Sequence, residues 1–366
     1  MKKNNLLVVL AAGAILLFLF SCSPAPGKHT TPSFYTLDDF AQVPKIDAHV
    51  HIRTYDSSFV QQAKHDNFRL LSIVVEEEPG IALQQQYAIA QQKSFPETVA
   101  FATTFSLNGF NSGSWINRTI DGLQEAVDQG AIAVKVYKSI GMELKDPDGN
   151  MVMVDNPMFN PVWDFLVKNN IPVIGHLGEP KNCWLPVEQM TINSDKRYYT
   201  RHPEFHMYLH PEYPSYEEQI QARDNMIAQH AELKFIGAHL GSLEWDTDEL
   251  AKRLNRFPNM AVDMAARISH LQLQVMNDRQ KVYDFFVRYQ DRLIYGTDRI
   301  VDDTKSPEEM KTFVHRAWLD DWKFFCTEDT MRSQAFDGVF KGLKLPKTIV
   351  NKIYYTNAVN WFAHFK

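Results

Sequence analysis

The chain has 366 residues, of which 45% are hydrophobic and 22% charged, and its formal net charge is -6. This is the balance of a soluble globular protein, and the mild acidity gives no support to nucleic-acid binding, which usually requires a basic surface. The length that remains after an N-terminal leader suits one large domain of barrel size.

The first predicted element is a targeting leader over residues 1–21. Two lysines precede an apolar run that is too short to span a bilayer comfortably. The run ends in Leu-Phe-Ser before Cys22, which resembles a bacterial lipoprotein cleavage box and predicts cleavage before Cys22 and its acylation. An ordinary secretory signal with a chance cysteine is the alternative. Residues 22–43 are predicted to be a tether, rich in Pro, Ser and Thr at its start. The chain would then be a membrane-anchored lipoprotein of the bacterial cell envelope, with its catalytic domain in the periplasm or outside the cell.

Residues 44–366 alternate short apolar segments with polar, helix-compatible ones. The apolar segments are often β-branched and near-continuously apolar, which is typical of strands buried on both faces. Eight such repeats predict the α/β class and a (β/α)8 TIM barrel. A doubly wound open sheet is the alternative, but no Gly-x-Gly-x-x-Gly follows the first strand. The expected strands are Lys45–His51, Arg69–Val75, Val99–Thr104, Ile132–Lys138, Pro172–His176, Lys234–His239, Met260–Met264 and Leu293–Tyr295; the expected helices are Ser114–Gln129, Asn160–Asn169, Tyr216–His230, Thr247–Arg256 and Asp278–Gln290.

Two of the expected loops are unusually long and follow the fifth and eighth strands, at Glu179–Pro214 and Arg299–Pro346. Loops after the strands of a barrel build its active-site face, so we expect lids or substrate contacts here. The first loop has histidines four residues apart, a spacing that would align them on a helix as a second metal site. Its prolines oppose a regular helix and favour a lid wall rich in tyrosine and histidine, in which Trp184 lines the pocket. The residues concerned are His202, His206, His210, Pro203, Pro211, Tyr198, Tyr199 and Tyr208.

Polar residues with metal-binding chemistry stand at the ends of several expected strands. His49 and His51 lie two residues apart on the first strand, so their side chains point the same way and reach one point in space. His176, His239 and Asp298 end the fifth, sixth and eighth strands. Each alone reads as a solvated strand end. Together they suit a divalent ion, which neutral imidazoles and one carboxylate bind with a position left open for water.

These motifs resemble the amidohydrolase superfamily, and more narrowly the amidohydrolase-related group that includes aminocarboxymuconate-semialdehyde decarboxylase. The resemblance extends from about Lys45 to the C-terminus and implies the fold of a metal-dependent hydrolase. The group contains both hydrolases and decarboxylases, so it does not define the reaction. The matching segments are Asp47-Ala48-His49-Val50-His51, Gly175-His176-Leu177-Gly178, Gly237-Ala238-His239-Leu240-Gly241, Tyr295-Gly296-Thr297-Asp298 and Tyr355-Thr356-Asn357-Ala358.

The resemblance implies a role for each of these residues. His49, His51 and His176 would bind one divalent metal ion, a zinc in our interpretation. Asp298 would ligate weakly and take a proton from the metal-bound water, and His239 would orient that water or polarise the substrate. Asp47 is predicted to share a face with the two first-strand histidines, one pleat deeper, and to make a structural hydrogen bond rather than a metal bond.

Lys135, in the fourth strand, admits several interpretations. Binuclear amidohydrolases carry a carboxylated lysine at this strand end, so Lys135 could bridge a second metal ion. It could also pair with a substrate carboxylate or with Asp47, or point outward between helices; a buried lysine needs a partner.

Four further residues are candidates for substrate contacts: Trp184, Glu179, Arg267 and Arg299. The two arginines could bind a substrate carboxylate bidentately, or pair with neighbouring acids. Glu179 matches the glutamate of the His-x-Gly-Glu motif of adenosine deaminases, where it acts as a general acid, but the following proline favours a solvated loop position.

Three functions remain open. The leading one is a metal-dependent hydrolase in which a metal-activated water attacks a small ester, lactone or amide, with Asp298 as base and His239 stabilising the oxyanion. The alternative is a metal-dependent decarboxylase of an aromatic or unsaturated carboxylic acid. A surface-anchored binding protein with an inactive barrel is the third, and the intact ligand set opposes it. The expected partner is a small-molecule substrate; the oligomeric state is left open, a homodimer included. The two other cysteines, Cys183 and Cys326, are expected to be free thiols.

Overall fold

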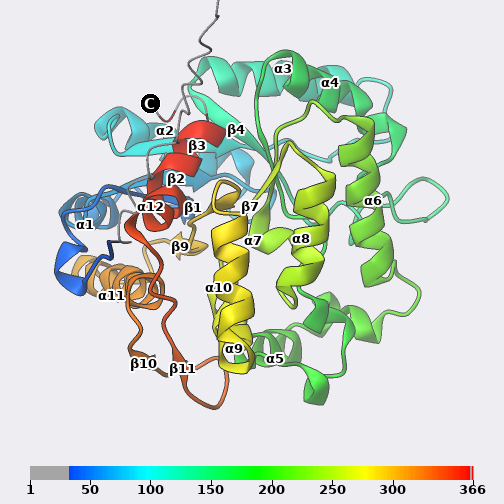
Figure 1. Ribbon diagram of the computed structural model, residues 1–366. Coiled ribbons are helices and arrows are strands. Elements are labelled where there is room, and N and C mark those ends of the chain that lie inside the picture. Colours follow the sequence, from blue (N-terminus) through cyan, green and yellow to red (C-terminus); the bar gives the residue numbers. More distant parts are fainter. Residues whose placement is uncertain (1–32, 363–364, 366) are drawn as a thin grey trace, which may run out of the picture. The chain divides into compact units, whose positions relative to one another are not determined.

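The computed structural model describes residues 33–362 and 365. A parallel sheet of nine strands forms a barrel surrounded by helices (Figure 1). The strands follow one another around the sheet in chain order from β1 to β8, and β9 lies on the other side of β1. They are β1 (Lys45–Ile52), β2 (Phe68–Ile73), β3 (Val99–Thr103), β4 (Ala131–Val136), β5 (Val173–Gly175), β6 (Phe235–Gly237), β7 (Met260–Asp263), β8 (Leu293–Ile294) and β9 (Arg299–Val301).

Helices follow most strands and cover the outside of the sheet, as the strand–helix alternation predicts (Figure 1). The main ones are α1 (Ser58–His65), α2 (Ile81–Ser94), α3 (Trp115–Asp128), α4 (Asn160–Lys168), α6 (Tyr216–Gln229), α8 (Thr247–Arg256), α10 (Arg279–Arg288) and α11 (Pro307–Cys326). The loops add α5 (Asn193–Arg201), α7 (Ala238–Gly241), α9 (Ile268–Asn277) and the hairpin β10 (Thr330–Met331) and β11 (Phe340–Lys341), and the chain ends in α12 (Lys347–Asn351) and α13 (Asn357–Trp361). Over the described residues, no helix combines the length and the apolar character needed to cross a membrane.

The barrel closes between its first and last strands. The backbone N–H of Ala48 donates to the carbonyl of Tyr295 just after β8, at 3.0 Å. The chain then crosses to the far side of β1, where Val50 and Arg299 are partners in a parallel ladder. Gly296 lies in this crossing, and a Cβ there would meet the Cβ of His49 at 2.8 Å. Only glycine allows the two segments to approach so closely.

Small and branched side chains fill the barrel interior. Ile46 and Ala48 from β1 belong to this inner cluster, together with Leu71, Ala102, Ile174, Ile236, Ala261 and Ile294 from the other strands. Phe362 and Phe365 from the C-terminal segment join the same cluster. A separate, larger cluster packs the outer faces of the strands against the helices. The strands are therefore buried on both faces, which explains why they read as nearly continuous apolar runs.

The described fold begins earlier than the sequence indicates. Residues 33–43 were predicted to belong to the tether, but Phe40 is 4% exposed and Val43 8% exposed. Phe34 forms a bridge with Pro346, and a short 3-10 turn, Leu37–Asp39, follows. This part of the expected tether therefore packs on the barrel. The predicted leader, Cys22 and the rest of the tether lie outside the described residues.

Candidate metal centre

A cavity of about 640 Å³ opens at the carboxyl ends of the barrel strands. Nearly all of the predicted site residues line it: His49, His51, His176, His239, Asp298, Lys135, Glu179, Arg267 and Arg299. Trp184 is outside this lining, which corrects its prediction as a pocket residue. Its indole N–H donates to the carbonyl of Pro214, and the centres of its ring and the Tyr216 ring lie 5.4 Å apart.

The first-strand histidines meet the carboxylate of Asp298 across the closure of the barrel. The Oδ1 atom of Asp298 lies 3.3 Å from Nε2 of His49 and 3.2 Å from Nε2 of His51. The ligand atoms of these three residues lie within 4.8 Å of one another, and both imidazoles are buried. Each ring is oriented from its other nitrogen, because Nδ1 of His51 is 2.7 Å from the carbonyl of Ile73 and Nδ1 of His49 is 2.8 Å from Asp263. Imidazole nitrogens fixed in this way are typical of metal ligands.

Asp263 is a residue of the candidate site that the sequence analysis missed. Its carboxylate accepts a hydrogen bond from His49 Nδ1 and another from the backbone N–H of His239, each at 2.8 Å. It is 2% exposed, and the pKa of its carboxyl is held below the usual value because the neighbouring His49 outweighs the opposing effect of burial. Asp263 ends β7, an apolar strand, just as the predicted residues end theirs, so the same rule would have identified it.

Two more imidazoles complete a continuous row. The centre of the His239 ring lies 4.9 Å from the centre of the His49 ring and 4.3 Å from the centre of the His176 ring. Burial lowers the pKa of His176 to about 4 and that of His239 well below its usual value, so both rings are neutral at pH 7. The buried Nε2 of His176 makes no hydrogen bond among the residues that the structure describes, since the Glu179 carboxylate, at 3.6 Å, is too far for one. A neutral imidazole with an unpartnered buried nitrogen fits a metal ligand.

The backbone is strained at two of these residues. His239 has φ 59° and Asp298 has φ 64°, in the left-handed region that non-glycine residues rarely adopt. Such conformations cost about 1 kcal/mol or more and persist where surrounding contacts hold them, often at functional sites. Here the backbone N–H of Asp298 donates to the carbonyl of His49 at 2.7 Å, and Asp263 holds the backbone of His239.

Asp47 has the structural role that was predicted but a different orientation. The register of β1 shifts between Asp47 and Val50, so Asp47 does not share a face with His49 and His51. Its carboxylate accepts hydrogen bonds from the hydroxyl of Thr297 at 2.6 Å and from the indole of Trp318 on α11 at 2.9 Å. Burial raises its pKa to about 6. Asp47 thus anchors the segment just before Asp298.

Lys135 points into the barrel, which excludes the outward position. Its Nζ lies 3.2 Å from Nε2 of His49, and the residue is 1% exposed. Burial lowers its pKa to about 8, although Asp263, Asp298 and Glu77 oppose that effect. The alternative partner Asp47 is instead engaged by Thr297 and Trp318. Lys135 is therefore a buried amine at the edge of the histidine cluster.

Glu179 is buried, and not in the solvated position that Pro180 was taken to favour. It is 4% exposed and forms an ion pair with Lys138, a residue not singled out from the sequence. Burial opposes ionisation, but Lys138 and His176 outweigh it and hold the pKa of Glu179 well below its usual value. Glu179 is thus a carboxylate whose Oε2 lies 3.6 Å from Nε2 of His176. It suits positioning rather than proton donation.

The loop after β5 forms a wall, as its tyrosines suggest, and not a second metal site. Tyr198 and Tyr199 on α5 line the cavity. The histidines further along flank two short 3-10 turns, Pro203–Phe205 and Met207–Leu209, and lie in neither. His206 is bonded to the carbonyl of Leu185. The two prolines prevent the helix that would align the histidines, so no common metal-binding point forms among these described residues.

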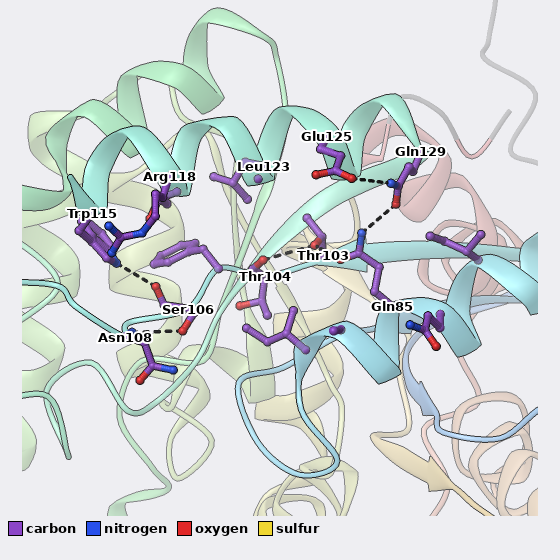
Figure 2. A pocket seen from close by; sticks show the side chains of 17 residues that line it. Gln85, Thr103, Thr104, Ser106, Asn108, Trp115, Arg118, Leu123, Glu125 and Gln129 are labelled. Carbon is purple, nitrogen blue, oxygen red and sulfur yellow. Dashed lines mark hydrogen bonds between the residues drawn. The ribbon is translucent and has the colours of Figure 1, made fainter.

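A second cavity, of about 570 Å³, lies between α2 and α3 on the outside of the barrel (Figure 2). Its polar edge includes Gln85, whose amide donates to Gln129, which donates in turn to Glu125. Among the residues that the structure describes, its lining contains no histidine, cysteine or aspartate. Its lining includes one carboxylate, that of Glu125, which accepts a hydrogen bond from Gln129, so the described lining residues offer no cluster of metal ligands. Cys183 and Cys326 are both buried free thiols, as predicted.

The comparisons with known proteins define the family of this chain. The sequence model of a family described as Amidohydrolase matches residues 46–363. The chain therefore belongs to the amidohydrolase family. It is an enzyme of a metal-dependent family, which sets aside the inactive binding barrel, and it has a His/Asp cluster that could bind a metal ion.

Solved structures show the same fold at low identity. A 2,6-dihydroxybenzoate decarboxylase from Rhizobium is 15% identical with a TM-score of 0.51, and the match covers 88% of this chain and 99% of that one. A candidate amidohydrolase from Staphylococcus aureus is 10% identical with a TM-score of 0.51, covering 87% and 99%. No curated protein sequence matches the chain. These likenesses confirm the TIM barrel.

Proposed function

We propose that the protein is a metal-dependent hydrolase that adds water to a small ester, lactone or amide. The observation that carries this proposal is the convergence of His49 Nε2, His51 Nε2 and Asp298 Oδ1 in a buried cluster. His176 would be the further ligand, through its unpartnered nitrogen. A zinc ion held by such a set would lower the pKa of a bound water to about 7 and would act as a Lewis acid on the carbonyl.

The residues of the chain would divide the remaining work. Asp298 is ionised, since the three neighbouring imidazoles outweigh burial and hold its pKa well below the usual range, so one of its oxygens can accept a proton. Nδ1 of His239 donates a hydrogen bond to the carbonyl of Ala265 at 2.9 Å, so the other ring nitrogen, Nε2, is directed to the side of the ring where the substrate would bind. Because Nδ1 carries the single proton of the neutral ring, Nε2 is an acceptor that can receive a hydrogen bond from the attacking water and orient it. Arg267 and Arg299 line the same cavity and can orient a substrate carboxylate.

Decarboxylation is the second candidate, and Arg267 is the observation that favours it. Its half-buried guanidinium makes one hydrogen bond among the described residues, to the carbonyl of Ala266 at 3.2 Å, and a long ion pair with Glu179 at 4.0 Å, and its Nε has no partner among those residues. Such a cation fits the carboxylate of an acid substrate. The similar structure from Rhizobium is itself a decarboxylase of an aromatic acid.

One experiment separates the two reactions. The zinc-loaded protein is incubated in ¹⁸O-labelled water with a panel of phenyl esters, lactones and anilides, and separately with dihydroxybenzoates while CO₂ is trapped. We expect ¹⁸O in a product carboxylate. Release of CO₂ without ¹⁸O incorporation would establish the decarboxylase instead. The control pair is Asp298→Asn, which should lose turnover at least a hundredfold while retaining some metal, and Asp302→Asn, a carboxylate outside the cavity lining, which should not.

The number of metal ions tests the role of Lys135. We propose one ion per chain, since Lys135 is an amine 3.2 Å from a ligand nitrogen and would be repelled by a dication if it were protonated. A carboxylated Lys135 that bridges two ions is the alternative. Elemental analysis of the purified protein distinguishes a ratio of one from a ratio of two.

We also propose that Cys22 is lipidated and anchors the enzyme in the cell envelope. The support is the sequence alone: a charged start, a short apolar run and a cysteine at its end. Incorporation of labelled palmitate into the protein, and its loss in Cys22→Ser, tests this. Absence of label in both would leave an ordinary secretory leader.

A further inference from the structure

A third cavity adjoins the candidate metal centre on the side of the loops after β4 and β5. Its volume is about 400 Å³, room for roughly a dozen groups of the size of a water molecule. Three methionines line it, Met142, Met151 and Met207, together with Phe205 and Tyr213. Met142 and Met207 are each 4% exposed. The charged residues at its rim, Glu143, Lys145 and Glu204, are exposed.

Lys138 lines both this cavity and the one at the metal centre. Its ammonium is paired with Glu179 in the catalytic cavity. The same nitrogen lies 5.7 Å from the ring centre of Tyr198, which lines the catalytic cavity, and 5.0 Å from that of Phe205, which lines the methionine cavity. The two rings are nearly parallel, with centres 6.4 Å apart. The two cavities therefore adjoin at Lys138, Tyr198 and Phe205.

The chemistry of the walls defines what the methionine cavity accepts. Thioether side chains are flexible and polarisable, so they adapt to apolar groups of irregular shape. The rim carries both signs of charge, so it favours neither an anionic nor a cationic group. The catalytic cavity, by contrast, is lined by imidazoles, carboxylates and cations and accepts the polar reacting group. The catalytic cavity thus suits the polar end of an amphipathic substrate, and the methionine cavity suits its apolar end.

We propose that the methionine cavity is a substrate subsite, and that it holds an alkyl or aryl group attached to the reacting carbonyl. This inference rests on the proposed function, because it places the head of the substrate at the metal centre. The substrate class is then an amphipathic acyl compound rather than a small polar one. Selectivity for the tail depends on the loops after β4 and β5, which are separate from the metal ligands.

Two hydroxamates test the subsite by binding rather than by turnover. Acetohydroxamic and octanohydroxamic acids share a metal-binding head and differ only in the length of the tail. Isothermal titration of the zinc-loaded protein gives the affinity of each. Burial of one methylene is worth about fourfold in affinity, so we expect octanohydroxamate to bind at least tenfold more tightly. Glu204→Trp at the rim and Met151→Trp in the wall should remove this gain and leave acetohydroxamate binding unchanged.

Met158→Trp is the matched control, because Met158 is 45% exposed and lies outside the cavity lining. It should keep the full gain. Circular dichroism melting shows whether each variant is folded, and either of the two filling variants suffices. The subsite is refuted if the wild type shows no gain with tail length, or if the gain survives in both filling variants. If acetohydroxamate itself does not bind, the proposed metal chemistry fails together with the subsite.

Discussion

Lys135 provides the sharpest test of the electrostatics at the site. It is a buried amine whose pKa is lowered from 10.5 to about 8, chiefly by burial. The folded protein therefore holds the proton of Lys135 less tightly than the unfolded chain does. This difference in pKa lowers the free energy of unfolding by about 3 kcal/mol, at about 1.4 kcal/mol for each pKa unit. This cost is fully present below pH 8 and disappears as the pH rises above 10.5.

Replacing Lys135 by Met should thus stabilise the metal-free protein by about 3 kcal/mol at pH 7. Urea unfolding of chelator-treated protein measures the change, and the gain should fall to less than half at pH 9.5. The same variant should lose activity, because the amine lies beside a metal ligand. A variant that is less stable than the wild type at pH 7 would refute the reasoning, since the neighbouring carboxylates would then outweigh burial.

Lys138 is the matched control, three residues further along the chain. Its pKa is raised, because the carboxylate of Glu179 outweighs burial. Removing its charge takes away the nearest cation of the buried Glu179 and leaves only the more distant Arg267, at 4.0 Å, and breaking a buried pair in this way costs about 3–5 kcal/mol. Lys138→Met should therefore destabilise the protein, with the opposite sign to Lys135→Met.

Three further outcomes follow from the same geometry. His176→Ala should lose bound metal as well as activity, as measured by elemental analysis; full retention of metal would remove His176 from the ligand set. Asp263→Asn should weaken metal affinity by about 10–100-fold, because the carboxylate orients His49, and competition with a chelating dye measures this. Because the pKa of His176 is about 4 in the folded protein against 6.5 unfolded, the unfolded chain takes up a proton first on acidification. The metal-free protein should therefore lose about 2 kcal/mol from this residue between pH 7.5 and pH 5, and His176→Asn should flatten that dependence in urea unfolding; an unchanged slope would contradict it.

The strands and most of the outer helices could be predicted because burial on both faces leaves a continuous apolar pattern. α2 could not, because its buried side chains include Gln84 and Gln91, whose amides bond to backbone carbonyls. A buried polar residue leaves no apolar stripe to detect. α5 and α9 lie in loops whose packing depends on tertiary contacts, such as the pair His270 and Asp195 that joins them.

The candidate site was predictable where its residues end apolar strands, and less so elsewhere. His49, His51, His176, His239 and Asp298 come together in one cavity as expected. The roles assigned to them stay predictions. The shift in register within β1 could not be foreseen, because nothing in an alternating pattern marks a bulge. The burial of Glu179 was equally hidden, since it depends on Lys138 from a different loop.

The closure of the barrel has a consequence for how the enzyme matures. His51 and Asp298 are 247 residues apart, so a ribosome makes the two histidines of β1 long before the carboxylate that meets them. Neither half of the polypeptide contains a complete binding set, and a nascent chain offers only a loose pair of imidazoles to passing cations. Under the proposed function, tight capture of an ion would await the last strand, and metal content would then be a marker of finished assembly.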